Sequence, residues 1–101
     1  MNYSIRFRPE VEYDALNAYH WYEDKSLGLG EEFLRVFYAN ALELVRNPFI
    51  YRKIYKNFRR RLLRRFPYAI YFVIENHTII VFGLFHTARD PKRIEKILND
   101  R

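Results

Sequence analysis

Two apolar segments separated by a tight turn set the strongest constraint on the fold. Residues Tyr68 to Glu75 and Thr78 to His86 are rich in β-branched and aromatic side chains, and only Asn76 and His77 lie between them. This pattern predicts a β-hairpin. Both segments are apolar on both faces rather than at alternate positions, so the hairpin is expected at the centre of a sheet. The rest of the chain must then cover both sides of that sheet.

The N-terminal half supplies the cover for one side. Tyr3 to Arg8 alternates apolar and polar residues, as a half-buried strand does. Pro9 then suits the first position of a helix with apolar residues at helical spacing. After a break at Ser26 to Gly30, a second helix is predicted from about Glu31 to Arg46, and Asn47-Pro48 ends it. The two helices are expected to form an αα-hairpin.

Beyond Pro48 the apolar periodicity changes. Tyr51 to Tyr55 could form a short strand or an irregular lead-in, and Phe58 to Phe66 has the pattern of a strand although it is dense in arginine. A short helix over Pro91 to Leu98 carries only a narrow apolar stripe, so part of the second sheet face is expected to stay open for a partner.

These elements predict one α+β domain over residues 1–101, because a chain of 101 residues has no room for a second core. The expected order is β-α-α-β-β-β-α. The sheet should be mostly antiparallel, packed by the N-terminal α-hairpin and carrying a short C-terminal helix.

Composition excludes several classes of function. The chain has no cysteine, which removes disulfides, thiolate metal sites and a thiol nucleophile. Its three histidines, His20, His77 and His86, lie far apart without a metal-binding spacing, so we expect neither a metal nor another cofactor. No apolar run approaches the roughly 20 residues of a membrane span, and the charged N-terminal residues do not resemble a signal segment. We therefore expect a soluble, cytoplasmic protein with no membrane partner.

Charge is distributed very unevenly along the chain. From Glu10 to Val45 acidic residues outnumber basic ones by eight to two, whereas Arg46 to Arg65 contains nine basic residues and no acidic one. The formal net charge of +6 is thus concentrated in one segment, which favours an anionic partner. That partner could be nucleic acid, an acidic protein segment or the chain's own acidic helices. A solvated face without any partner is the alternative.

The arginine-rich strand can be interpreted further, because alternate side chains of a strand lie on opposite faces. The predicted strand places Arg61, Leu63 and Arg65 on one face, and Arg60, Leu62, Arg64 and Phe66 on the other. Neither face is fully apolar. This suggests that arginine stems cover aromatic surface while the guanidinium groups reach a groove or rim.

A second basic position follows the predicted hairpin. His86 ends a buried strand and Arg89 lies three residues later, so one sheet edge would carry an imidazole and a guanidinium able to bind an anion or to perform acid–base chemistry. The alternative is structural, with His86 bonded to nearby backbone and Arg89 paired with Asp90 or a helix terminus. No serine has a neighbouring base and no glycine-rich phosphate loop is present.

Four blocks of the sequence resemble the toxin subunits of the RelE/ParE superfamily of type II toxin–antitoxin modules. These blocks are YSIRFRPEVEYDA, GLGEEFLRVF, FRRRLLRRFPYAIYF at 58–72 and VFGLFHTARDP at 81–91. The resemblance covers nearly the whole chain and implies a small sheet with a helical hairpin packed across it. It also implies a partner, a small antitoxin whose acidic and apolar C-terminal part is largely disordered until it folds onto the toxin.

Two activities divide this superfamily. RelE-like members are ribosome-dependent mRNA endoribonucleases, and that resemblance would make Arg60, Arg64, His86 and Arg89 the catalytic candidates. The nuclease type has arginine directly after the tyrosine of its Tyr-Arg-Leu-x-Tyr strand, where this chain has Ala69 after Tyr68, and a tyrosine near the C-terminus, where this chain has KILNDR. The FPYAIYF strand and the residues from His86 to Pro91 are more similar to the ParE branch. Its characterised members poison DNA gyrase by holding the cleavage complex, which is binding rather than catalysis.

The resemblance and the charge pattern together define an expected surface for binding the target or the antitoxin: Arg59, Arg60, Arg61, Arg64, Arg65, His86 and Arg89. The leading hypothesis is a ParE-like gyrase poison that inhibits replication and growth until its antitoxin neutralises it. The alternatives are a RelE-like mRNA interferase that inhibits translation, and a degenerate toxin that only binds its antitoxin as a co-repressor. The antitoxin is expected to lie along the sheet and helical hairpin and to touch Arg59 to Arg65.

Overall fold

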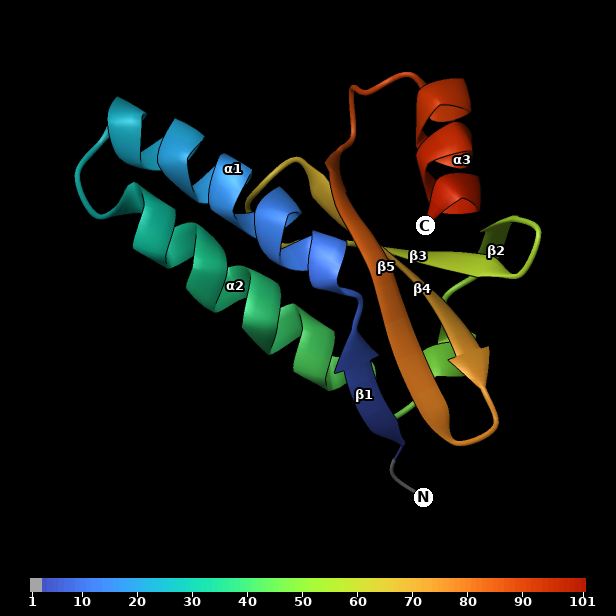
Figure 1. The fold of residues 1–101 in the computed structure, drawn as a ribbon. Coiled ribbons are helices and arrows are strands. Elements are labelled where there is room, and N and C mark those ends of the chain that lie inside the picture. Colours follow the sequence, from blue (N-terminus) through green and yellow to red (C-terminus); the bar gives the residue numbers. More distant parts are fainter. Residues whose placement is uncertain (1–2) are drawn as a thin grey trace.

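The computed structural model describes residues 3–101 as a mixed sheet with helices on both faces (Figure 1). The strands are β1 (Ser4–Phe7), β2 (Lys53–Tyr55), β3 (Phe58–Leu62), β4 (Tyr68–Glu75) and β5 (Thr78–His86). The helices are α1 (Pro9–Lys25), α2 (Leu29–Glu43) and α3 (Pro91–Asp100), with a 3₁₀ turn at Pro48–Ile50. The five strands lie in the order β1-β5-β4-β3-β2, which confirms the predicted α+β class. No helix within residues 3–101 has both the length and the apolar character needed to cross a membrane.

The β4–β5 hairpin lies at the centre of the sheet, as predicted. Its antiparallel register runs from Tyr68 opposite His86 to Glu75 opposite Thr78, and Asn76 closes the turn with a φ of 57°. Asparagine tolerates this left-handed conformation better than most residues. Ala69 and Ile70 point to opposite faces and are both fully buried, so each face of β4 is covered.

The helical hairpin α1–α2 covers one face of the sheet (Figure 1). Its core contains Val11, Ala15, Ala18, Tyr22, Phe33, Phe37, Ala41 and Leu44, packed against Ile70, Phe72, Ile79, Val81 and Leu84 of the sheet. The helices approach closely at Gly30, where an added Cβ would lie 2.6 Å from the Tyr19 carbonyl oxygen. Glu23 of α1 accepts hydrogen bonds from the backbone nitrogens of Gly28 and Gly30 at 2.8 and 2.9 Å, which satisfies the first free donors of α2.

Helix α3 covers the other face only in part. Ile94 and Leu98 pack on Phe58, Ala69, Tyr71 and Phe85 to form a second, smaller core. Beyond this core, Leu62 of β3 is 56% exposed and Ile54 of β2 is 39% exposed. The second face therefore keeps an open apolar area, in the region where the sequence predicted incomplete cover.

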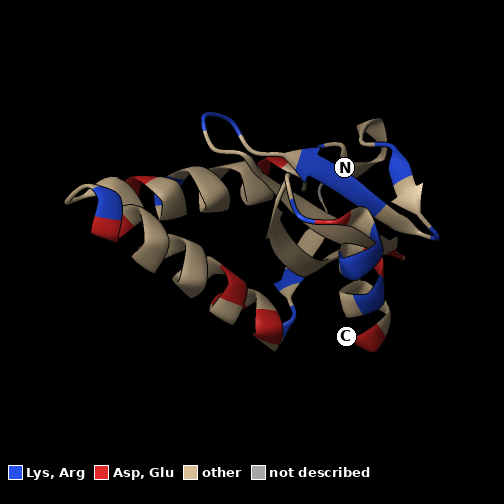
Figure 2. Ribbon diagram, turned by 90° about the horizontal axis from the view of Figure 1, so that it is seen from above, with Lys and Arg blue, Asp and Glu red and all other residues tan. Residues whose placement is uncertain are grey.

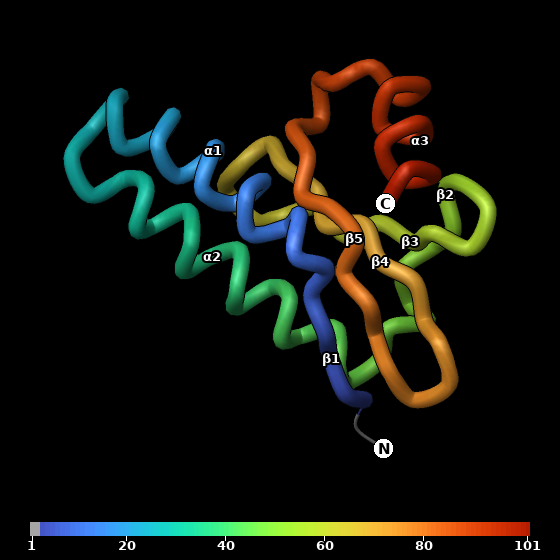
Figure 3. Tube along the Cα trace, in the orientation of Figure 1, coloured from blue at the N-terminus to red at the C-terminus, as the bar shows by residue number. Residues whose placement is uncertain are grey.

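A bulge in β5 is stabilised by an ion pair from outside the sheet. Tyr71 pairs with Gly83 and Phe72 with Val81, so Phe82 is an extra residue in β5. Arg101, at the end of α3, donates to the Phe82 carbonyl oxygen at 2.8 Å, and Asp14 of α1 accepts from the Leu84 backbone nitrogen at 3.1 Å. Arg101 and Asp14 also form two hydrogen bonds to each other, of 2.6 and 2.9 Å. Figure 3 shows the end of α3 beside the middle of β5, where this contact forms.

Strand β2 shows that the region from Tyr51 to Tyr55 forms a short strand, one of the two expected alternatives, which adds one strand to the expected order. The pair of β1 with β5 is parallel and the other pairs are antiparallel, so the sheet is mostly antiparallel as predicted. One strand boundary differs from the prediction. Strand β3 ends at Leu62, so its predicted extension to Phe66 was wrong. Arg65 has a φ of 70° and the Leu63 backbone nitrogen donates to the Tyr68 carbonyl oxygen, which turns the chain early. Phe66 consequently joins the core under α1 and α2 instead of the face of Arg60.

The helix boundaries also shift slightly. Helix α2 runs over Leu29–Glu43 rather than from about Glu31 to Arg46, since Gly28, with a φ of 88°, allows the helix to begin earlier. Helix α3 extends to Asp100, beyond the predicted end at Leu98.

The bulge contact gives a first prediction. Replacing Asp14 by alanine leaves the half-buried Arg101 guanidinium and the Leu84 N–H without their acceptor, so we expect the free energy of unfolding to fall by about 2 to 3 kcal/mol. Chemical denaturation measures this change. Glu12→Ala, at an exposed site on the same helix, is the control and should change stability by less than about 0.5 kcal/mol. An Asp14→Ala protein as stable as the control would show that the pair contributes nothing.

Candidate functional site

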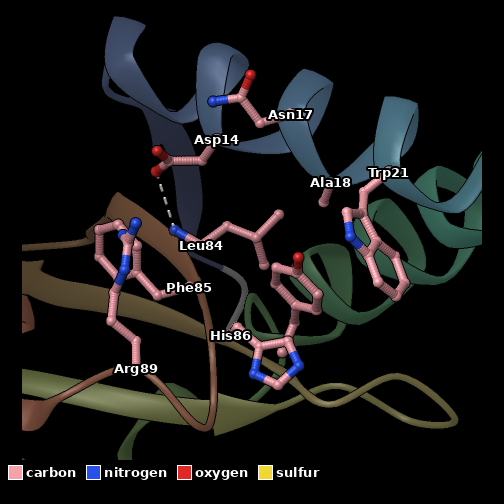
Figure 4. A pocket seen from close by; sticks show the side chains of 9 residues that line it. Asp14, Asn17, Ala18, Trp21, Leu84, Phe85, His86 and Arg89 are labelled. Carbon is pink, nitrogen blue, oxygen red and sulfur yellow. Dashed lines mark hydrogen bonds between the residues drawn. The ribbon is translucent and has the colours of Figure 1, made fainter.

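Two pockets lie on either side of the C-terminal end of β5. The first, here called the α1-side pocket, has a volume of about 410 Å³ and is lined by Asp14, Asn17, Ala18, Trp21, Tyr68, Leu84, Phe85, His86 and Arg89 (Figure 4). The second, the α3-side pocket, has a volume of about 120 Å³ and is lined by Ile54, Arg60, Tyr71, Thr87, Arg89, Pro91, Ile94 and Glu95. Arg89 lines both pockets, so it connects the two faces of the sheet at this edge.

The turn after β5 is anchored at both ends. The Thr87 backbone nitrogen donates to the Pro67 carbonyl oxygen at 2.8 Å, which ties the turn to the β3–β4 connection. The Asp90 side chain accepts from the Lys92 backbone nitrogen at 3.0 Å and so caps α3, which begins at Pro91. Between these anchors, the Arg89 guanidinium lies 5.3 Å from the centre of the Phe85 ring.

His86 is oriented as a hydrogen-bond donor. Its Nδ1 accepts from the Ala88 backbone nitrogen at 3.0 Å, so a neutral imidazole carries its hydrogen on Nε2. The ring packs edge-on against Tyr68, with centres 5.1 Å apart, while the side chain remains exposed. This local bond to backbone agrees with the structural alternative drawn from the sequence, but it leaves Nε2 available.

Tyr68 is a second donor in the α1-side pocket. Burial raises the pKa of its hydroxyl above the usual value of 10.0, and the positive charge of Arg89 opposes this shift only in part. The hydroxyl therefore stays protonated at neutral pH.

Most of the arginine segment binds the chain's own oxygen atoms. Arg61 is only 7% exposed and lies 2.8 Å from a Glu43 carboxylate oxygen and 2.8 Å from the Tyr51 hydroxyl. Arg64 donates to both oxygens of Glu43, at 3.0 and 2.9 Å. These contacts give Arg61 a structural role. The Arg64 contact holds the β3–β4 connection against α2.

Two more arginines of this segment are also held within the fold. Arg65 lies 2.6 Å from a carboxylate oxygen of Glu32 on α2. Arg59 donates to the Tyr51 carbonyl oxygen at 2.6 Å and its guanidinium lies 5.0 Å from the centre of the Phe49 ring. Of the partners considered for this segment, the chain's own acidic helix thus accounts for Arg61, Arg64 and Arg65.

Arg60 differs from its neighbours. It points to the α3 side of the sheet and lines the α3-side pocket with Arg89. Neither side chain takes part in an ion pair within residues 3–101. Figure 2 shows Lys and Arg gathered on the sheet and its connections, with Asp and Glu along the helical hairpin. The structure therefore brings Arg89 together with Arg60 in one pocket and with His86 in the other, whereas Arg64 is paired with Glu43 of α2.

Sequence reasoning missed Trp21 and Asn17, which form the α1 wall of the larger pocket. No motif or charge pattern of the sequence singles out either residue. The position of Trp21 provides the missing signal, because Ala18 and Tyr22 define the buried stripe of α1 and Trp21 lies one residue outside it. The part of the chain that the structure describes places no three histidine or acidic side chains together as a metal site.

Comparisons with known proteins agree with this architecture. Residues 5–91 match the family model described as the ParE toxin of the type II toxin–antitoxin system parDE. The fold is similar to a structure of the chromosomal ParDE toxin–antitoxin system from P. aeruginosa, with a TM-score of 0.70 and 16% identity over 83% of this chain and 95% of that one. It is also similar to the toxin–antitoxin complex RelBE2 from Mycobacterium tuberculosis, with a TM-score of 0.63 and 17% identity over 85% of this chain and 99% of that one. The comparison with curated proteins gives no match.

The Glu43 contacts predict how stability depends on pH. Hydrogen bonds from Arg64, and more weakly from Arg61, lower the pKa of the Glu43 carboxyl below its usual value of 4.5. Because the folded-state pKa is lower than the unfolded one, ionised Glu43 stabilises the fold above about pH 4.5, and this contribution is lost as the pH falls through the lower value. Denaturation of wild type and Glu43→Gln from pH 7 to pH 2 should show a stability difference that shrinks below pH 4.5. Glu31→Gln, at an exposed site on α2, serves as the control, and a difference independent of pH would contradict the assignment.

Proposed function

The chain belongs to the family of ParE toxins of type II toxin–antitoxin systems, and from this premise we propose that it poisons DNA gyrase in the cytoplasm rather than cutting RNA. In this proposal the toxin binds gyrase during strand passage and holds the cleaved DNA intermediate, which stops replication and growth. A cognate antitoxin keeps the toxin inert until it is released.

The observation that carries this proposal is that three of the four residues that a nuclease would need, Arg60, His86 and Arg64, lie apart. RNA cleavage requires a base for the 2′-hydroxyl, an acid for the leaving oxygen and a charge stabiliser around one phosphate. Here Arg89 lines both pockets, but Arg60 lines only the α3-side pocket, His86 lines only the α1-side pocket and Arg64 is paired with Glu43. Ala69, where the nuclease branch has arginine, is fully buried and provides no charge.

The size of the α3-side pocket supports binding as well. Its volume of about 120 Å³ is well below the roughly 300 Å³ at which ligand-binding pockets begin, so a nucleotide cannot be enclosed there. The surface of a partner protein, in contrast, can bind these side chains without being enclosed in the pocket. Arg60 and Arg89 line this pocket with Ile54, and the exposed Leu62 lies two residues after Arg60 on the same face of β3. Arginines beside apolar residues are frequent hot spots of protein interfaces. We assign these four residues to the gyrase contact.

The antitoxin contact draws on a different set of residues. Arg64 and Arg65 are each 63% exposed although both are paired, so their outer nitrogens can still meet an acidic segment. A groove of about 380 Å³ between α1, α2 and β1 includes Phe7, Leu16 and Tyr38, which are exposed apolar or aromatic side chains suited to the apolar residues of such a segment. Electrostatic attraction would speed association, and apolar burial would slow release.

The gyrase proposal predicts a direct biochemical effect. Purified toxin added to gyrase, supercoiled plasmid and ATP should produce linear plasmid after detergent and protease treatment, because the cleaved complex is trapped. The double variant Arg60→Ala, Arg89→Ala should lower the yield of linear plasmid at least about tenfold, since two interface arginines are removed. Arg93→Ala, an exposed arginine of α3 outside both pockets, should remain active.

The same protein added to a translation extract distinguishes the alternative. Intact mRNA together with linear plasmid supports gyrase poisoning. Truncated mRNA without linear plasmid would overturn it in favour of an mRNA interferase. Absence of both effects, with normal growth on expression, would leave a toxin that only binds its antitoxin.

The antitoxin proposal predicts a salt-dependent association. Raising the salt concentration should slow association of the two proteins more than it accelerates dissociation, because charge acts mainly on encounter. Arg64→Gln combined with Arg65→Gln should reduce the association rate and its salt dependence, whereas Leu16→Ser should mainly raise the dissociation rate. Stopped-flow or surface-based kinetics would measure both rates. A complex in which Arg59 to Arg65 stay as accessible as in the free toxin would contradict this placement.

A further inference from the structure

The α1-side pocket shares only Arg89 with the proposed gyrase contact, and it has the features of a binding site of its own. Its volume of about 410 Å³ accepts one large side chain together with its neighbours in a peptide. Leu84 forms an apolar floor, and Trp21 forms an aromatic wall at its mouth. Trp21 is 54% exposed, which is unusual for the largest apolar side chain of an amphipathic helix.

Hydrogen-bond donors gather on the opposite side of this pocket. Figure 4 shows α1 above β5, with Arg89 beside Phe85 on one side of the strand and His86 on the other. Arg89 takes part in no ion pair within residues 3–101, His86 presents Nε2–H, and Tyr68 presents a protonated hydroxyl. Three donors without an acid among them attract an anionic group.

The only carboxylate that lines the pocket does not neutralise these donors. Both oxygens of Asp14 are bound by Arg101, and one of them also accepts from the Leu84 backbone nitrogen. A further positive charge lies at the mouth, where the Lys25 ammonium is 4.7 Å from the centre of the Trp21 ring. The pocket therefore combines positively charged side chains at its sides with an apolar floor.

The surroundings favour a protein carboxylate over a nucleic acid. A phosphodiester strand extends beyond any single pocket and needs basic side chains along its path. Here the adjoining helix α1 carries five acidic residues, Glu10, Glu12, Asp14, Glu23 and Asp24, against one basic residue, Lys25. A single carboxylate on a peptide can bind inside the pocket without lying along the acidic surface of α1.

We propose that the α1-side pocket binds a segment of a partner protein in which an Asp or Glu carboxylate adjoins a large apolar side chain. The carboxylate accepts hydrogen bonds from Arg89 and His86, and the apolar side chain packs against Trp21 over Leu84. The site shares Arg89 with the proposed gyrase contact, but none of these contacts involves Arg60 or the open apolar face beside it.

Trp21 provides the means to test this site. It is the only tryptophan of the chain, so one indole N–H signal in a ¹H–¹⁵N spectrum reports the pocket. The probe is the blocked dipeptide acetyl-Phe-Glu-amide, and its matched control is acetyl-Phe-Gln-amide. We expect the Glu peptide to shift the indole signal saturably and to bind at least about fivefold more tightly than the Gln peptide, because only the carboxylate forms charge-assisted hydrogen bonds.

A pair of variants separates the carboxylate contact from simple apolar binding. Arg89→Gln should remove the preference for the Glu peptide and leave the Gln peptide unchanged, while Arg89→Lys should keep part of the preference. Arg93→Gln should behave as wild type. Dispersed spectra of each variant show that the fold is intact, and Arg89 is an exposed turn residue.

Uridine monophosphate and uridine serve as the nucleic-acid probes in the same spectra. Tighter binding of the nucleotide than of the Glu peptide would overturn the proposal and identify a nucleotide site. Equal affinity for the Glu and Gln peptides, or no saturable shift with either, would overturn it as well. A trapped gyrase complex would have no bearing on these outcomes, so this test and the gyrase test fail separately.

Discussion

The ion pair between Asp14 and Arg101 holds the three layers of this fold together. An extra residue in β5 leaves the Phe82 carbonyl and the Leu84 N–H without partners in the sheet, and the ion pair provides one partner for each. Since Asp14 belongs to α1 and Arg101 follows α3, the same contact fixes both helices relative to β5. Helix α1 forms a wall of the α1-side pocket and α3 forms a wall of the α3-side pocket. The geometry of both pockets therefore depends on the ion pair at the β5 bulge.

The arginine segment shows that a concentration of charge in the sequence need not remain a concentration of available charge in the fold. Arg61 and Arg64 share Glu43, and Arg65 is paired with Glu32, so the acidic helix α2 balances much of the basic strand next to it. The alternation of a strand sends Arg60 to the opposite face, away from these acids. The proposed gyrase contact therefore uses Arg60, which forms no ion pair with the acidic residues of the helical hairpin.

Local patterns predicted most of the fold, and contacts between distant residues account for what they missed. The apolar hairpin and the two long helices follow from periodicity within each segment. The early end of β3 depends on the burial of Phe66 under a helix from the other half of the chain, and no local pattern contains that contact. For the candidate site, residue type and position predicted Arg60 and Arg89, which line one pocket, whereas the exposure of Trp21 was not predicted because an aromatic residue on a helix is usually packed.

The parallel pairing of β1 with β5 has a consequence for how the chain reaches this structure. Ser4 pairs with Thr78, so the first strand to be synthesised waits for the last one before it gains a partner. Strands β3, β4 and β5 are neighbours in sequence and can assemble first, but joining β1 to them closes a loop that contains almost the whole domain. During translation the helical hairpin is therefore exposed before its sheet exists, and the nascent chain carries an unpaired apolar surface until late in synthesis.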